Sequence, residues 1–127
     1  MKSYNQFINE DVTTEKRFVI NNNKFQLFLD NILVSETDFS IEQPDEWFDE
    51  KYATIFDLKT FKNFRGKGFA KYLLEQIFDY VKNELKLNII TLIVYKKNTK
   101  AVNLYFKCGF EIYKEYDDSY SLIKRLY

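Results

Sequence analysis

The chain has 127 residues, a length typical of one domain, and 46% of them are hydrophobic, 13 Phe and 10 Tyr among them, which excludes a disordered chain. Nineteen Lys and Arg balance nineteen Asp and Glu, so no overall charge attracts nucleic acid or an anionic membrane. The single Cys excludes an internal disulfide and a cysteine zinc cluster, and the absence of His excludes Ser–His and Cys–His catalytic pairs.

The N-terminal half predicts an antiparallel meander. Residues 1–15 are polar and fit either an extended arm or a short helix. Strand-like segments at 17–20, 24–29 and 32–41 then follow one another, separated by Asn- and Asp-containing turns. Residues 42–51 are acidic, contain the only Pro, and fit a loop or a short helix.

The middle of the chain predicts a strand, a break and the longest helix. Residues 52–58 form a mostly apolar strand pattern, which ends at 59–66. From 68 to 87 the apolar residues recur at helical spacing and make one stripe: Ala70, Leu73, Leu74, Ile77, Val81 and Leu85.

The C-terminal part predicts a buried strand, a second helix and a hairpin. The run 89–95 is unbroken and rich in β-branched residues, as in a central strand covered on both faces. A helix is expected over 99–108, capped by Asn98 or Thr99 and ended by Gly109. Two more strands, at 110–113 and 119–125, close a mixed sheet with helices packed on it.

The turn Arg65-Gly66-Lys67-Gly68-Phe69-Ala70 lies between a strand and the longest helix. Free N–H groups and the dipole at a helix start favour an anion, and glycines allow close approach to the backbone. A pyrophosphate therefore fits here, although a tight turn with solvated cations fits the hexapeptide about equally well. Phe69 after Gly68 excludes a Walker A loop, and Lys71 excludes the dinucleotide fingerprint.

A second motif follows about thirty residues later: Asn98-x-x-Ala101-x-x-Leu104-Tyr105, then Gly109-Phe110. Together with Arg65-x-x-Gly68-x-Ala70, in this order, it resembles the GNAT superfamily of acyl-CoA-dependent N-acyltransferases. The resemblance covers roughly residues 52–126 and implies a single GNAT-type domain over 1–127. The implied fold is α/β (α+β): a mixed, mostly antiparallel sheet, splayed between its central strands, with helices packed on both faces.

The same resemblance implies how the site would work. Acetyl-CoA would lie between the splayed strands, and its acetyl group would pass directly to a primary amine of a small molecule or peptide, without a metal. Tyr105 would protonate the leaving CoA thiolate. The residues implied to bind CoA are Leu58 and Thr60 beside the pantetheine, Asn98 on the pantetheine arm, and Arg65, Gly66, Lys67, Gly68, Phe69 and Ala70 around the pyrophosphate.

The general base and the acceptor are less defined by the sequence. Asp57 and Glu50 are candidates for the base by position, and an outward-facing strand residue is the simpler interpretation of Asp57. For Tyr105 the alternative is a core aromatic. The short link between residues 20 and 24 leaves no room for the helices that wall the acceptor pocket in the family, so an early helix could only lie within 3–15.

The sequence leaves three function classes to be distinguished. The alternative to an acetyltransferase is a non-catalytic acyl-CoA-binding module that serves regulation or assembly, and Tyr105 favours the enzyme. The neutral charge and the two ordered motifs argue against nucleic-acid binding. The absence of a signal core or an apolar stretch of ~18–20 residues favours a cytoplasmic protein without a membrane partner, and the family is compatible with a homodimer.

Overall fold

The computed structural model describes residues 15–127, so the arm or helix expected before them lies outside the described residues. Seven strands, two α-helices and one short 3₁₀ helix follow one another within these described residues. They are β1 (Lys16–Asn21), β2 (Lys24–Leu29), β3 (Ile32–Glu42), β4 (Tyr52–Thr60), η1 (Lys62–Phe64), α1 (Phe69–Asn83), β5 (Ile89–Tyr95), α2 (Thr99–Lys107), β6 (Glu111–Glu115) and β7 (Ser119–Arg125).

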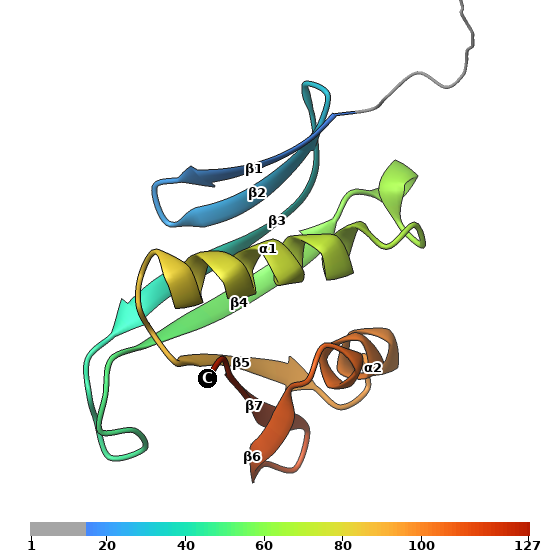
Figure 1. The fold of residues 1–127 in the computed structure, drawn as a ribbon. Helices are drawn as coiled ribbons and strands as arrows, with labels where there is room; N and C mark the ends of the chain where they lie inside the picture. The colour runs from blue at the N-terminus through green and yellow to red at the C-terminus, as the bar shows by residue number, and fades with distance from the viewer. Residues whose placement is uncertain (1–14) are drawn as a thin grey trace, which may run out of the picture.

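The strands form one sheet in the order β1-β2-β3-β4-β5-β7-β6. Every neighbouring pair is antiparallel except β4 and β5, which are parallel and are linked by the crossover through α1. Figure 1 shows β4 and β5 running apart below α1, with α2 at the open end of β5. The predicted mixed, mostly antiparallel sheet with splayed central strands is confirmed.

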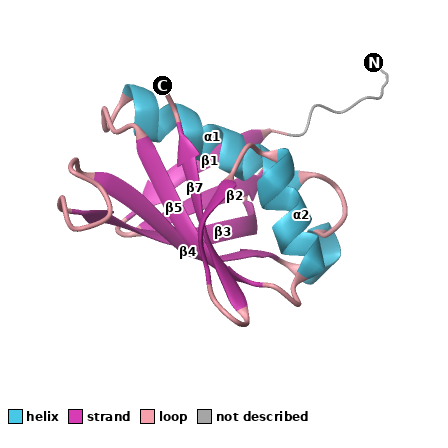
Figure 2. Cartoon of the chain, turned by 90° about the horizontal axis from the view of Figure 1, so that it is seen from below, coloured by secondary structure: helices cyan, strands magenta, loops and turns pink. Residues whose placement is uncertain are grey.

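The two helices lie on the same face of the sheet (Figure 2). Leu73 and Ile77 of α1 share one core with Tyr105 of α2, and Phe78 of α1 packs against Phe110 just after α2. In this respect the fold differs from the expected helices on both faces: within residues 15–127 no helix covers the second face. The reason is the two-residue turn between β1 and β2, which contains no helix.

The acidic segment between β3 and β4 is a loop, not a helix, and it covers one end of the second face. The carboxylate of Asp45 accepts hydrogen bonds from the N–H groups of Trp47 and Phe48, and from the hydroxyl of Tyr52. Phe48 packs edge-on against Tyr52, with ring centres 4.9 Å apart, and also against Tyr113. The loop thereby closes a small second core around the start of β5.

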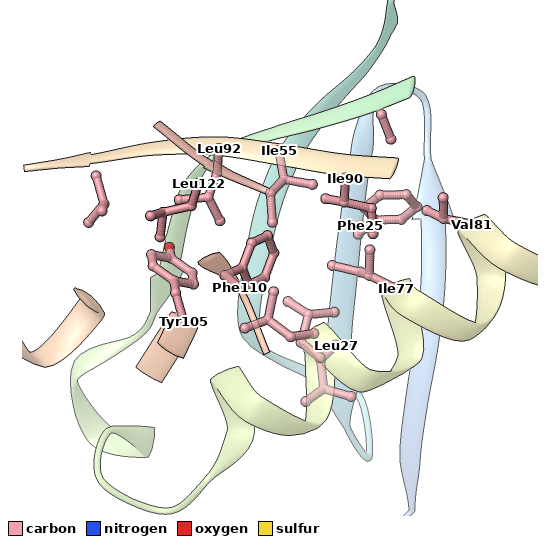
Figure 3. Close-up of a cluster of buried hydrophobic side chains, with 14 of the residues drawn as sticks. Phe25, Leu27, Ile55, Ile77, Val81, Ile90, Leu92, Tyr105, Phe110 and Leu122 are labelled. Carbon is pink, nitrogen blue, oxygen red and sulfur yellow. The ribbon is translucent and has the colours of Figure 1, made fainter. Parts of the chain in front are cut away.

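The main core lies between the helices and the sheet, and Figure 3 shows its side chains meeting from both sides. The predicted stripe of α1 supplies its fully buried residues Leu73, Leu74, Ile77 and Val81. Phe25 of β2 is fully buried and stacks on Phe39 of β3, with ring centres 3.9 Å apart. Alternation along the strands therefore directs one side of the sheet into this core.

Two predicted boundaries shift. Strand β4 continues to Thr60, two residues beyond the predicted end, because its pairing with β3 resumes past an irregularity. Helix α1 ends at Asn83 rather than at 87, because Lys86 adopts a left-handed φ of +59° and the N–H of Leu87 bonds back to the carbonyl of Val81. This is the bonding that closes a helix with a left-handed residue, here a Lys in place of the usual Gly.

Replacing Phe25 tests this core. We expect Phe25→Ala to lower the free energy of unfolding by about 3–5 kcal/mol, because it removes a fully buried aromatic ring and leaves a cavity. Ile32→Ala, at a residue 57% exposed in the neighbouring strand, is expected to cost less than about 1 kcal/mol. Equal losses of unfolding free energy in the two variants, measured by urea denaturation, would contradict the placement of Phe25 in the core.

Candidate functional site

The site begins where β4 and β5 separate. The two parallel strands pair at two positions only, Ala53 with Ile90 and Thr54 with Thr91. The hydroxyl groups of Thr54 and Thr91 lie 2.9 Å apart and mark the last paired position. Beyond it, the backbone of β4 has no strand beside it on the β5 side.

A β-bulge bends β4 just after this separation. The residues Asp57 and Leu58 lie opposite the single residue Thr37 of β3, and Asp57 has a left-handed φ of +58°. An inserted residue of this kind bends a strand and increases its twist, and Asp is one of the residues that tolerate a positive φ. The bulge therefore turns the end of β4 away from β5.

A cavity of about 720 Å³ opens at the end of β4. Its walls come from the bulged half of β4, the turn before α1, the first turn of α1 and one face of α2. The lining residues are Leu58, Lys59, Thr60, Phe64, Arg65, Gly66, Gly68, Phe69, Ala70, Lys71, Asn98, Lys100, Ala101, Leu104 and Tyr105.

The glycine turn gives the cavity an anion-binding wall. Gly66 and Gly68 have φ values of +75° and +85°, which favour Gly at both positions, and Gly68 is the N-cap of α1. The first N–H groups of α1 have no partner within the helix, so they are available to an anion. The side chain of Arg65 donates from Nε to the carbonyl of Thr60 at 2.8 Å and thus ties the turn to β4.

Helix α2 supplies the opposite wall. Asn98 caps it, with its side-chain oxygen accepting the N–H of Ala101 at 3.4 Å. Residues three or four apart lie on the same face of a helix, so Asn98, Ala101 and Tyr105 all line the cavity. The spacing within the second sequence motif is therefore the spacing of one helix face.

Tyr105 is buried and only 7% exposed. Its ring packs edge-on against Phe110, and Figure 3 shows its hydroxyl group directed from α2 toward the strands. Burial raises the pKa of Tyr105 to about 12, with a smaller contribution from Cys108, because an apolar surrounding disfavours the phenolate. The phenol consequently keeps its proton throughout the neutral range.

Three predicted residues do not line this cavity. Lys67 instead borders a separate hollow of about 490 Å³ with Lys16 of β1. Asp57 is exposed at the bulge, next to the lining residue Leu58. Glu50 lies in the loop before β4, beside a hollow that also contains Arg125, and the structure does not bring it to the cavity.

Several lining residues were missed by the sequence analysis as site residues. Ala101 and Leu104 could have been found from their helical spacing to Asn98, whereas no local signal marks Phe64 of the 3₁₀ helix. The cations Lys59, Lys71 and Lys100 join Arg65 in the lining, which includes no carboxylate among the described residues. The cavity is thus cationic, as an anionic ligand requires.

The model of the acetyltransferase (GNAT) family matches residues 13–110, more than three quarters of the chain. The chain belongs to this family. Both sequence motifs lie within or at the end of the matched range, and the resemblance noted from the motifs is confirmed.

Two curated relatives are similar over part of their length. The spermidine N(1)-acetyltransferase of Vibrio cholerae is 39% identical over 69 residues, which are 50% of this chain and 40% of that protein. The acetyltransferase PseH of Campylobacter jejuni is 38% identical over 56 residues, 44% of this chain and 36% of that protein. The matched segments thus span less than half of either relative.

Solved structures agree on the fold. The PseH structure in complex with acetyl coenzyme A is 27% identical, with a TM-score of 0.63, over 83% of this chain and 70% of that chain. PH1933 of Pyrococcus horikoshii is 25% identical, with a TM-score of 0.70, over 82% of this chain and 65% of that one. The splayed sheet is therefore the GNAT fold.

Residues 15–127 lack two further classes of feature. No group of three or more Cys, Asp and Glu side chains that could hold a metal ion occurs there. Over the same range, neither helix is long and apolar enough to cross a membrane.

The raised pKa of Tyr105 can be measured directly. We expect the tyrosinate absorbance of the wild type minus that of Tyr105→Phe to stay flat between about pH 9 and 11, because Tyr105 ionises only near 12. The stability gained from burying the neutral phenol is complete below about pH 10 and is lost as the pH rises through 12. A difference spectrum with a midpoint near 10 would contradict the burial of this group.

Proposed function

We propose that the protein transfers an acetyl group from acetyl-CoA to a primary amine. The observation that supports this most strongly is the cavity itself, because it gathers the unpaired half of β4, the glycine turn and Tyr105 of α2 around one space. The family supports acyl-CoA chemistry, and the similar PseH structure contains acetyl coenzyme A.

Successive parts of the cavity lining would bind successive parts of acetyl-CoA. The turn Gly66–Gly68, with the first N–H groups of α1, would hold the pyrophosphate, and Arg65 and Lys71 add positive charge. The backbone of Leu58 and Thr60 would pair with the pantetheine, since no strand lies beside it there. Asn98, on the facing helix, would contact the pantetheine arm.

Besides these groups, the reaction would need an acceptor amine and a base. The neutral amine attacks the thioester carbonyl carbon, a C–N bond forms, and the C–S bond breaks. Tyr105, which is protonated at neutral pH, donates its proton to the leaving thiolate and regains one from water. An N–H of the bulged strand would polarise the carbonyl oxygen, and the alignment of amine and thioester would supply much of the acceleration.

The proton released by the amine needs an acceptor. Asp57 is exposed at the bulge and adjoins the lining residue Leu58, whereas Glu50 lies beside a different hollow. Asp57 is therefore proposed as the base, acting through water, in preference to Glu50.

The amine acceptor is proposed to approach from the second face. Phe56, next to the bulge, is 44% exposed there, and Ile93 and Tyr95 of β5 are also exposed. These side chains offer apolar contacts to the carbon chain of an acceptor, and the exposed carboxylate of Asp57 suits its primary amine, in a small molecule or a peptide. The spermidine acetyltransferase among the relatives is consistent with an amine of this class.

The proposed pyrophosphate site at the glycine turn can be tested by placing a negative charge there. Gly68→Ala and Gly68→Glu impose the same strain at a φ of +85°, and neither Cβ meets an atom within 4 Å. We expect Gly68→Glu to bind acetyl-CoA at least about tenfold more weakly than Gly68→Ala in calorimetry, because only the carboxylate repels the phosphates. Equal affinities of the two variants for acetyl-CoA would contradict pyrophosphate binding at this turn.

Turnover can separate an enzyme from a CoA-binding module. A screen of polyamines, aminoglycosides, amino acids and peptides, followed by the release of CoA thiol, would identify the acceptor. With it, Tyr105→Phe is expected to bind acetyl-CoA normally but to turn over about a hundredfold more slowly, because it lacks the proton donor.

The base is tested in the same assay. Asp57→Asn is expected to be slow, and the matched change Glu50→Gln, outside the cavity, to be nearly as fast as the wild type. Acetyl-CoA binding without turnover of any amine would favour the non-catalytic module. Turnover by Tyr105→Phe as fast as by the wild type would contradict the role of Tyr105 as proton donor.

A further inference from the structure

Two buried hydroxyl groups of β3 lie against the bulge of β4. Ser35 and Thr37 are 0% and 1% exposed. The hydroxyl of Thr37 donates to the carbonyl oxygen of Phe56 at 2.9 Å, and that of Ser35 donates to the carbonyl oxygen of Lys59 at 2.9 Å. The two bonds flank the bulge, one on each side.

Their position in the register explains why hydroxyl groups stand there. Thr37 pairs with Phe25 and Ser35 with Leu27, so both side chains point into the main core, where an alanine or valine would pack without burying a polar atom. A bulge disrupts the ladder between two strands, and buried backbone carbonyls still need donors. The hydroxyls supply them, and Thr60 adds its own hydroxyl 3.1 Å from that of Ser35.

We infer that Ser35 and Thr37 are positioning residues for the acyl-CoA slot. By holding the carbonyls before and after the bulge, they fix the direction in which β4 leaves β5 and thereby the orientation of the Leu58–Thr60 backbone toward the cavity. They do not line the cavity themselves. The inference rests on the proposed function, because it assigns the slot to acyl-CoA.

The chain offers matched variants for a test. Thr37→Val removes the hydroxyl at nearly constant volume, and Thr37→Ser restores it. Ser35→Ala removes the second hydroxyl, and Ser40→Ala makes the same change on the same strand, where the hydroxyl bonds to Glu42 instead of to the bulge. Each variant is examined at a temperature at which circular dichroism shows it to be folded.

Two measurements are made on each variant. Amide hydrogen exchange of residues 57–60 by NMR is recorded without ligand, and acetyl-CoA affinity is measured by calorimetry. We expect Thr37→Val and Ser35→Ala to exchange faster at these amides and to bind acetyl-CoA about tenfold more weakly. Thr37→Ser and Ser40→Ala are expected to stay within about twofold of the wild type. Should Thr37→Val not fold, Ser35→Ala carries the same comparison.

Three results would be decisive. Wild-type exchange and affinity in both Thr37→Val and Ser35→Ala would overturn the inference, as would an equal loss in Ser40→Ala, which would show a general effect of instability. If the wild type binds no acetyl-CoA, the proposed function fails, whereas the exchange at residues 57–60 still decides whether the hydroxyls hold the bulge.

Discussion

The rest of the structure depends on the separation of two parallel strands. β4 and β5 pair at two positions only, and the bulge at Asp57 and Leu58 then turns β4 away. Backbone groups that lose a strand partner in a buried place cost about 1–3 kcal/mol each unless something else bonds to them. The separation therefore creates a slot whose wall favours a ligand with amide groups of its own.

Both helices direct their N-terminal ends to this slot. Gly68 is the N-cap of α1 and Asn98 that of α2, and both residues line the same cavity. The partial positive charge of a helix start, together with Arg65 and Lys71, favours an anionic ligand at one end. The buried, protonated phenol of Tyr105 lines the same space. The cavity thus gathers elements far apart in the chain that the core holds together.

Much of this arrangement follows from local patterns in the sequence. The apolar stripe of α1, the β-branched run of β5 and the spacing from Asn98 to Tyr105 each act within one element, where period and capping decide the structure. The bulge could not be predicted, because a left-handed Asp57 inside a strand pattern arises in the pairing of β4 with β3, which lies elsewhere in the chain. The position of Glu50 outside the cavity could not be predicted either. The loop that carries Glu50 is shaped by the hydrogen bonds that Asp45 accepts from Trp47 and Tyr52.

Acetyl-CoA is proposed to bind in the slot between β4 and β5. The most direct measurement is a map of backbone amide shifts by NMR as acetyl-CoA is added to the ¹⁵N-labelled protein. The largest shifts are expected at Leu58–Thr60, at Gly66–Ala70 and at the start of α2. Shifts confined to other surfaces, or none at millimolar ligand, would contradict binding in this slot.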